Sequence, residues 1–234
     1  MKRILFLCVA LLSMQLSYSQ KDVRIKKKDR KKDILIQTTS GNMIVRLSDL
    51  TPLHRDNFIK LVKQHYFDSI LFHRVINKFM IQAGDPESKG AAKGKPLGNG
   101  GPEYNVPAEF HPSLFHQKGV IAAARESDDV NPKKESSGSQ FYIVQGKTFT
   151  DGALDTLEVK RLKRKIPVEQ REVYKTIGGT PQLDQNYTVF GQVVSGLNVI
   201  DKIAVVETSK GIDRDRPIED VMIIHAKLVK RKKL

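Results

Sequence analysis

The most informative stretch of the chain, residues 72–85, reads Phe72-His73-Arg74-Val75-Ile76-Asn77-Lys78-Phe79-Met80-Ile81-Gln82-Ala83-Gly84-Asp85. Its arginine alternates with large apolar residues, and Gln82 follows Phe79 and Met80 at a strand-like spacing. The pattern predicts a pair of strands that place one cation and one amide beside an apolar surface. Ordinary strands with Arg74 exposed fit the pattern equally well, so this stretch alone does not decide the function.

Short runs rich in β-branched and aromatic residues lie on both sides of this stretch. Two of them flank a turn at Ser40-Gly41-Asn42 and predict a hairpin over residues 34–47. The other predicted strands are residues 71–76, 79–83, 119–124, 141–144, 188–194 and 221–229. Many short strands with few helices favour a mainly β barrel or sandwich over a fold of alternating strands and helices.

Three helical patterns interrupt the strands. Thr51-Pro52 predicts the start of a helix with Leu53, Phe58, Leu61 and Val62 near one face, and residues 197–205 predict a second helix. The third pattern covers about residues 150–178, where Pro167 suits the start of a second segment and Gly178-Gly179 suits its end. Its apolar stripe is formed by Leu154, Leu157, Leu162 and Ile166. We therefore expect a helical hairpin inserted between strands.

The N-terminal residues 1–19 have the pattern of a secretory signal peptide. Lys2 and Arg3 precede an apolar run over residues 4–12, and the small residues of Ser17-Tyr18-Ser19 predict cleavage before Gln20. An uncleaved anchor is the alternative, but the run is shorter than the roughly 20 residues that span a bilayer. Because no later segment is as apolar, we expect an exported protein without a membrane span.

The only cysteine, Cys8, lies inside this segment. The remaining chain can therefore form no disulfide and offers no thiol nucleophile or thiolate ligand. Lipid attachment at Cys8 is an alternative, although the residue comes before the apolar run ends. His111 and His116 flank a proline-containing loop, but no histidines pair at a helical metal-binding spacing. We predict no metal and no cofactor.

Cations are concentrated in a few runs of the sequence. The formal net charge is +14, and removing Lys2 and Arg3 lowers it to +12. Residues 20–32 are expected to form a basic flexible leader and residues 231–234 a basic tail. These runs could attract nucleic acid or an anionic membrane surface. No aromatic residues interleave with them, so we favour solvated charge and expect no specific nucleic-acid partner.

Four motifs, in order along the chain, resemble the signatures of the cyclophilin family: Phe-His-Arg-Val-Ile, Phe-Met-Ile-Gln-Ala-Gly-Asp, Gly-Ser-Gln-Phe-Tyr-Ile and Val-Phe-Gly-Gln-Val. The resemblance covers residues 33–230 and is interrupted mainly by the insertion at about 150–178. It implies a cyclophilin-like fold, a closed eight-stranded antiparallel barrel capped by two helices.

The resemblance also implies roles for nine residues. Arg74 looks like the catalytic arginine, assisted by Gln82, while Gln82, Gln140 and Ala124 look like groups that hold the substrate backbone. The proline pocket would be formed by Phe79, Met80, Tyr142, Leu183 and Tyr187. Four positions depart from the commonest pattern: Tyr142 replaces a frequent Phe, Tyr187 a frequent His, Arg125 a frequent Asn and Gln182 a tryptophan that contacts cyclosporin.

The implied activity is cofactor-independent peptidyl-prolyl cis-trans isomerisation. Its partners would be unfolded or flexible proline-containing polypeptides, and we expect a monomer that acts on exported proteins in a bacterial periplasm. A chaperone or proline-peptide reader with incidental turnover is an alternative, as is a protein that docks on anionic surfaces.

Within the insertion, residues 160–165 form a basic run of Lys160, Arg161, Lys163, Arg164 and Lys165. One hypothesis is that the insertion overhangs the site and favours acidic sequence around the proline. A solvated appendage on the barrel wall is the alternative.

Overall fold

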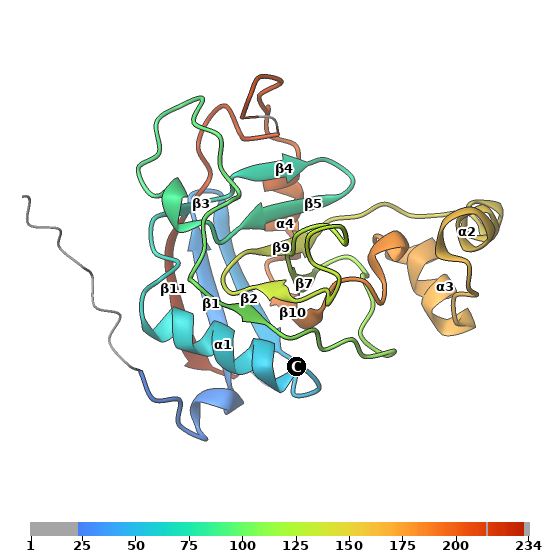
Figure 1. Cartoon of the computed structure of the whole chain (residues 1–234), viewed down its shortest axis with the longest axis horizontal. Helices are drawn as coiled ribbons and strands as arrows, with labels where there is room; N and C mark the ends of the chain where they lie inside the picture. The colour runs from blue at the N-terminus through green and yellow to red at the C-terminus, as the bar shows by residue number, and fades with distance from the viewer. Residues whose placement is uncertain (1–22, 214, 232–234) are drawn as a thin grey trace, which may run out of the picture.

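The computed structural model describes residues 23–213 and 215–231. The expected signal peptide and Cys8 lie outside these residues. The fold is mainly β, with antiparallel strands curled around an apolar core (Figure 1). The helix α1 contacts strands β10 and β11, and α4 contacts β2, β4 and β5.

The main sheet has nine strands in the order β3-β11-β1-β2-β10-β7-β9-β5-β4, and all neighbouring strands are antiparallel. The strands are β1 (Lys32–Thr38), β2 (Gly41–Leu47), β3 (Ile70–Leu71), β4 (Arg74–Ile76), β5 (Met80–Ala83), β7 (Val120–Ala123), β9 (Phe141–Val144), β10 (Val189–Ser195) and β11 (Met222–Lys230). Two short strands absent from the sequence prediction, β6 (Asn105–Val106) and β8 (Ser136–Ser137), pair with each other.

The prediction of a closed eight-stranded barrel is wrong in strand number and in closure. The single strand expected over residues 71–76 is interrupted at Phe72 and His73, so β3 pairs with β11 while β4 pairs with β5. The backbone donors around this break bind the chain after α4: Phe72 N donates to Val221 O at 2.8 Å and Val75 N to Asp215 O at 2.8 Å. Among the described residues no ladder joins β3 to β4, and the curled sheet stays open between them.

Two helices, α1 (Pro52–Lys63) and α4 (Leu197–Ala204), form close to where the sequence predicts them. The insertion forms α2 (Asp151–Leu157), a π-helical turn η3 (Glu158–Leu162) and α3 (Val168–Thr176). Three short 3-10 helices complete the described elements: η1 (Asp29–Lys31), η2 (Pro86–Ser88) and η4 (Pro181–Leu183).

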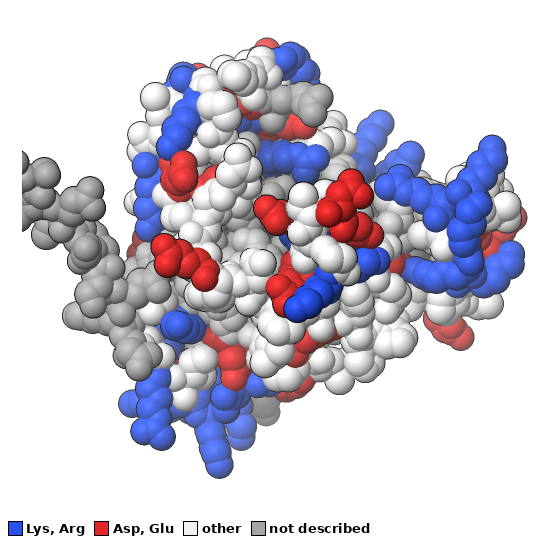
Figure 2. Space-filling view, viewed as in Figure 1, with Lys and Arg blue, Asp and Glu red and all other residues white. Residues whose placement is uncertain are grey.

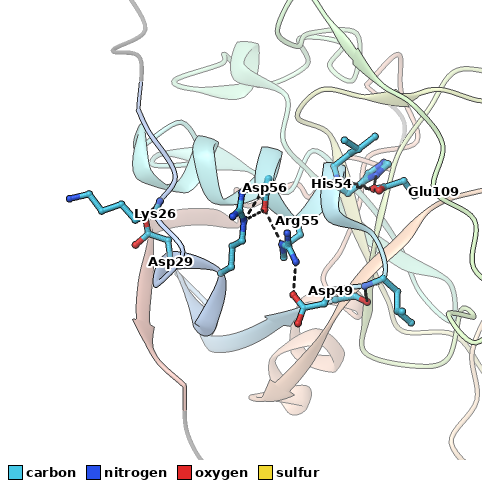
Figure 3. Close-up of polar contacts among 11 residues, drawn as sticks. Lys26, Asp29, Asp49, His54, Arg55, Asp56 and Glu109 are labelled. Atoms are coloured by element: carbon cyan, nitrogen blue, oxygen red, sulfur yellow. Dashed lines mark hydrogen bonds and ion pairs between the residues drawn. The ribbon is translucent and has the colours of Figure 1, made fainter.

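The N-terminus of α1 is capped by a distant residue. Thr51 occupies the N-cap position, yet its side chain makes no capping hydrogen bond. Glu109 takes over this task because its carboxylate accepts from Leu53 N at 3.0 Å and from His54 N at 2.9 Å, and it lies 2.7 Å from His54 Nδ1 (Figure 3). A carboxylate here satisfies free backbone donors and is stabilised by the helix dipole.

The other side of α1 holds the chain that precedes β1. Arg30 forms a bidentate contact with Asp56, the shorter distance being 2.6 Å, and Lys63 Nζ donates to the buried Asp29 at 2.9 Å. Asp56 accepts from Arg30 Nε at 3.0 Å and from Arg55 Nε at 2.9 Å, and Figure 3 shows the side chains of Asp56 and Arg55 turned toward each other. The sequence predicts flexibility for residues 20–32, but from Arg24 onward the described part of this segment contacts α1, the apolar core or itself.

The insertion projects from one side of the curled sheet (Figure 1) and has a small core of its own. Leu154, Ile166 and Tyr174 are buried there, packed against Phe115 and Phe149. The returning chain passes so close to the body that a Cβ on Gly179 would lie 2.2 Å from the carbonyl oxygen of His116. The predicted helix end at Gly178-Gly179 is therefore also the point where the insertion joins the sheet.

Candidate active site

One cavity of about 140 Å³ gathers eight of the nine residues that the sequence singles out. The strand register explains this: Arg74 on β4 lies opposite Gln82 on β5, and Gln82 lies opposite Tyr142 on β9. Side chains at directly opposed positions share one face of a sheet. The cavity is lined by Arg74, Phe79, Met80, Gln82, Ala124, Arg125, Tyr142, Leu183 and Tyr187.

A chain of side-chain amides fixes Gln82 against Arg74. Gln140 Nε2 donates to the carbonyl oxygens of Gly98 and Gly100, both at 2.8 Å, so its own oxygen is free to accept from Gln82 Nε2 at 3.1 Å. The oxygen of Gln82 then accepts from Arg74 Nη1 at 3.3 Å. The loop that contains Gly98 and Gly100 thus orients the guanidinium through two glutamines, while 43% of the arginine side chain stays exposed.

Gln140, the ninth predicted residue, lies in a neighbouring cavity of about 480 Å³. The two cavities share Gln82, Ala124 and Arg125, so together they form one cleft along the sheet. The backbone of Ala124 is already paired, because its N donates to Gln140 O at 3.0 Å and its O accepts from Ser137 N at 2.8 Å. Ala124 therefore contributes chiefly an apolar wall, and its backbone N–H is not free to hold a substrate.

Two tyrosines and an arginine shape the other side of the small cavity. The rings of Tyr142 and Tyr187 meet edge to face, with centroids 6.0 Å apart. Arg125 lies over the Tyr187 ring, 4.6 Å from its centroid, and its Nε donates to Asn186 O at 2.7 Å. The sequence left the contact of Arg125 open, and the structure makes it part of the cavity wall. Gln182 is half-buried in η4 and is not among the described lining residues.

The far side of Arg74 faces a loop that the sequence did not connect with it. Asp215 Oδ2 lies 3.9 Å from Arg74 Nε, beside a further cavity of about 480 Å³ that is also lined by His73, Lys210 and Arg216. This ion pair is partly exposed, so its Coulomb energy is small, but it restricts the arginine. The residues are more than a hundred positions apart in the sequence, and no local pattern marks the pair.

A buried polar network lies behind the cavity. His116 Nδ1 lies 2.9 Å from Asp184 Oδ1, and its Nε2 lies 2.9 Å from the Tyr142 hydroxyl. Asp184 Oδ2 accepts from the Tyr174 hydroxyl at 2.6 Å. Burial raises the pKa of Tyr142 well above its usual range, so this hydroxyl stays protonated.

Within the described part of the chain, one group of side chains could ligate a metal, and it lies away from the cavity. Ligand atoms of His65, Asp68 and His225 lie within 4.8 Å of one another. They already bond to each other, since Asp68 Oδ2 lies 3.1 Å from His65 Nδ1 and 2.7 Å from His225 Nδ1. Asp68 Oδ1 also accepts from Ala226 N, so the group fastens the turn after α1 to β11. His111 and His116 face different partners, Ser113 and Asp184.

The insertion does not overhang this cavity. None of the described residues in 150–178 lines it. Lys160, Arg161, Lys163 and Lys165 are exposed, and Figure 2 shows lysine and arginine side chains gathered over the projecting end of the molecule. The insertion meets the site from behind, where Arg164 Nη2 donates to Asp184 O at 3.4 Å. Across residues 23–213 and 215–231, no helix is both long and apolar enough to cross a bilayer.

Comparisons with known proteins agree on one family. A model described as cyclophilin type peptidyl-prolyl cis-trans isomerase/CLD matches residues 33–228. A protein of Staphylococcus aureus (strain USA300) and one of Staphylococcus epidermidis (strain RP62A), each named "Putative peptidyl-prolyl cis-trans isomerase", are 35% and 34% identical to this chain. These matches cover 81% and 83% of this chain and 88% and 90% of the relatives.

The solved structures show the same fold. A crystal structure of a Cryptosporidium parvum cyclophilin type peptidyl-prolyl cis-trans isomerase superposes with a TM-score of 0.61 at 22% identity, covering 86% of this chain and 99% of that one. The curled sheet thus carries a cleft in which Arg74 borders apolar and aromatic side chains. The chain belongs to the cyclophilin-type peptidyl-prolyl cis-trans isomerases, which are enzymes that need no cofactor.

Proposed function

We propose that this isomerase accelerates rotation about X-Pro bonds in unfolded or flexible exported polypeptides, with Arg74 as the catalytic group. The observation that carries the proposal is the small cavity in which one guanidinium borders a wall of apolar and aromatic side chains. Proline would enter between Phe79, Met80, Tyr142, Leu183 and Tyr187. A relative's crystal structure in the presence of the dipeptide Ala-Pro, also a cyclophilin of Cryptosporidium parvum, supports proline-containing peptides as ligands.

The reaction needs charge stabilisation and no covalent step. Rotation must overcome amide resonance, a barrier of about 18 to 20 kcal/mol. In the twisted transition state the prolyl nitrogen regains a lone pair, which a fixed donor binds better than it binds the planar ground state. A hydrogen bond to a charged group contributes roughly 1.5 to 3 kcal/mol. Since each 1.36 kcal/mol changes the rate by about tenfold, Arg74 alone would accelerate the rotation by roughly tenfold to a hundredfold.

The rest of the acceleration would come from holding one side of the bond still. The cavity wall holds the proline ring, and Gln82 contacts the flanking peptide while its own oxygen orients Arg74. Gln140 supports this arrangement by fixing the orientation of Gln82. Lysine would be a poor replacement for Arg74, because a mobile ammonium lacks the planar fork.

Export is the second part of the proposal. The signal-like pattern of residues 1–19 supports it, as does the lack of cysteine after Cys8, which leaves the protein insensitive to an oxidising compartment. In a bacterial periplasm the substrates would be newly exported chains, whose uncatalysed proline isomerisation takes tens of seconds. The intact mass of protein recovered from the periplasm should show a chain that starts at Gln20. A full-length mass would contradict cleavage, and an added lipid mass would instead indicate modification of Cys8.

A protease-free assay tests the activity itself. Exchange between the cis and trans forms of a short X-Pro peptide is followed by NMR with catalytic amounts of the full chain. We expect faster exchange with the protein than without it. Binding of the peptide without faster exchange would identify a proline-peptide reader and contradict the proposed function.

A further inference from the structure

A continuous chain of buried side chains joins the insertion to the cavity. It starts at Tyr174 on α3, passes through Asp184 after η4 and His116 before β7, and ends at the hydroxyl of Tyr142 on β9. All four side chains are buried, with relative exposures of 0%, 2%, 1% and 4% in that order. The four residues come from four separate segments, so the network exists only in the folded molecule.

The hydrogen-bonding capacity of each group fixes the direction of the network. A carboxylate only accepts, and Asp184 takes the Tyr174 hydroxyl, His116 N at 2.8 Å and His116 Nδ1. His116 therefore presents its Nε2 to the Tyr142 hydroxyl, and no other polar contact of that hydroxyl occurs among the described residues. Since an unpaired buried hydroxyl is unfavourable, His116 holds the Tyr142 ring in one position.

The same network also holds a second wall of the cavity. Leu183 and Tyr187 lie on the segment that contains Asp184, and both line the cavity together with Tyr142. Arg164 of the insertion adds a contact to the carbonyl oxygen of Asp184. The Tyr174 ring is fixed in turn by edge-to-face contacts with Phe115 and Phe149, at centroid distances of 5.5 and 6.4 Å. The insertion is thus rigidly connected to two sides of the cavity.

We propose that Tyr174 of the insertion is a positioning residue for the proline pocket, acting through Asp184 and His116 on Tyr142. This inference rests on the proposed function of the cavity. It assigns the insertion a role in shaping the pocket from behind, and it needs no contact between the insertion and the substrate. Tyr142, which stands where the resemblance leads us to expect Phe, is then the group through which the insertion acts.

A double-mutant cycle tests the connection. Tyr174→Phe removes one hydroxyl and keeps the packed ring, while Tyr142→Phe removes the end of the network at the cavity. Turnover and peptide affinity are measured for the wild type, both single variants and the double variant, using the NMR exchange assay and an NMR titration with an X-Pro peptide. Thr150→Ala is the control for general loosening of the insertion, because it removes only the side-chain cap of α2, the 3.2 Å bond from Ala153 N.

We expect Tyr174→Phe to lower kcat/KM by about threefold to tenfold in the wild-type background, a size typical of coupling within one buried network. In the Tyr142→Phe background the same change should have almost no further effect on kcat/KM or on peptide affinity. Thr150→Ala should lower thermal stability and leave kcat/KM unchanged. Equal losses in both backgrounds, no loss in either, or the same loss with Thr150→Ala would overturn the proposal. A wild type that binds the peptide without turnover would refute the isomerase function alone, because the affinity cycle would still test the network.

Discussion

The buried imidazole of His73 should make the fold sensitive to mild acid. Its side chain lies at the break between β3 and β4, next to Arg74, and only 4% of the residue is exposed. Burial lowers the pKa of His73 to about 4, against the attraction of Asp85 and with added repulsion from Arg74 and Arg216. Protonation therefore favours the unfolded chain, in which the ring has its ordinary pKa of about 6.5.

The size and sign of the effect follow from linkage. Because folding lowers this pKa, His73 is neutral in both states above about pH 6.5 and the full stability of the fold is present there. The free energy of unfolding then decreases as the pH falls from about 6.5 toward about 4. At pH 5 the two pKa values predict a loss of about 2 kcal/mol in the free energy of unfolding, with a limit of about 3 kcal/mol below both. Burial lowers the pKa of His54 as well, and this adds a loss of the same sign.

Urea unfolding at pH 8 and pH 5 measures the effect, with His73→Gln as the variant and His111→Gln as a matched control that removes one half-exposed imidazole. Glutamine cannot be protonated, so His73→Gln should reduce the stability difference between the two pH values by about 2 kcal/mol. His54 remains in every variant, and comparison between variants therefore isolates His73. The reasoning fails if His73→Gln keeps the full pH dependence of the wild type.

Three further changes probe the supports of the site. Glu109→Ala should lower the free energy of unfolding by about 1 to 3 kcal/mol in a urea titration, because it leaves the α1 donors and the buried His54 without their acceptor. The kcat/KM of this variant should remain unchanged. Gln140→Ala should reduce kcat/KM by about threefold to tenfold, because Gln82 loses the contact that orients it. An unchanged kcat/KM would show that the hydrogen bond from Gln82 to Gln140 does not support catalysis. Gln182→Trp should strengthen cyclosporin inhibition of peptide isomerisation, and equal inhibition constants would show that this position does not limit it.

The centre of the site could be predicted from the sequence through its resemblance to the cyclophilin signatures, whereas the alternating pattern around Arg74 left the function open. The structure adds the physical reason that Arg74, Gln82 and Tyr142 lie together: they occupy directly opposed positions on three neighbouring strands. The insertion was also recognisable, because proline and diglycine mark its segment boundaries. The connection of the insertion to the cavity could not be predicted, because it depends on the contact between Asp184 and His116 in the folded molecule.

The features that the sequence missed all depend on contacts between distant segments. The break at Phe72 and His73 lies within a stretch whose pattern predicts one strand over residues 71–76, and at this break the chain near Asp215 and Val221 accepts the local backbone donors. Glu109 caps α1 from 55 residues away, where Thr51 offered the expected local signal. Local propensity predicts elements, whereas such tertiary contacts decide how they begin, end and join.

The most direct test of the central claim is the kcat/KM of Arg74→Ala for cis-trans exchange of a short X-Pro peptide. The arginine side chain is 43% exposed and adds little to the core, so the variant should keep its fold and most of its peptide affinity. We predict that kcat/KM falls by at least about tenfold, and that Arg74→Lys recovers only part of the loss. A folded Arg74→Ala protein that turns over the peptide at the wild-type rate would contradict the proposed role of this residue.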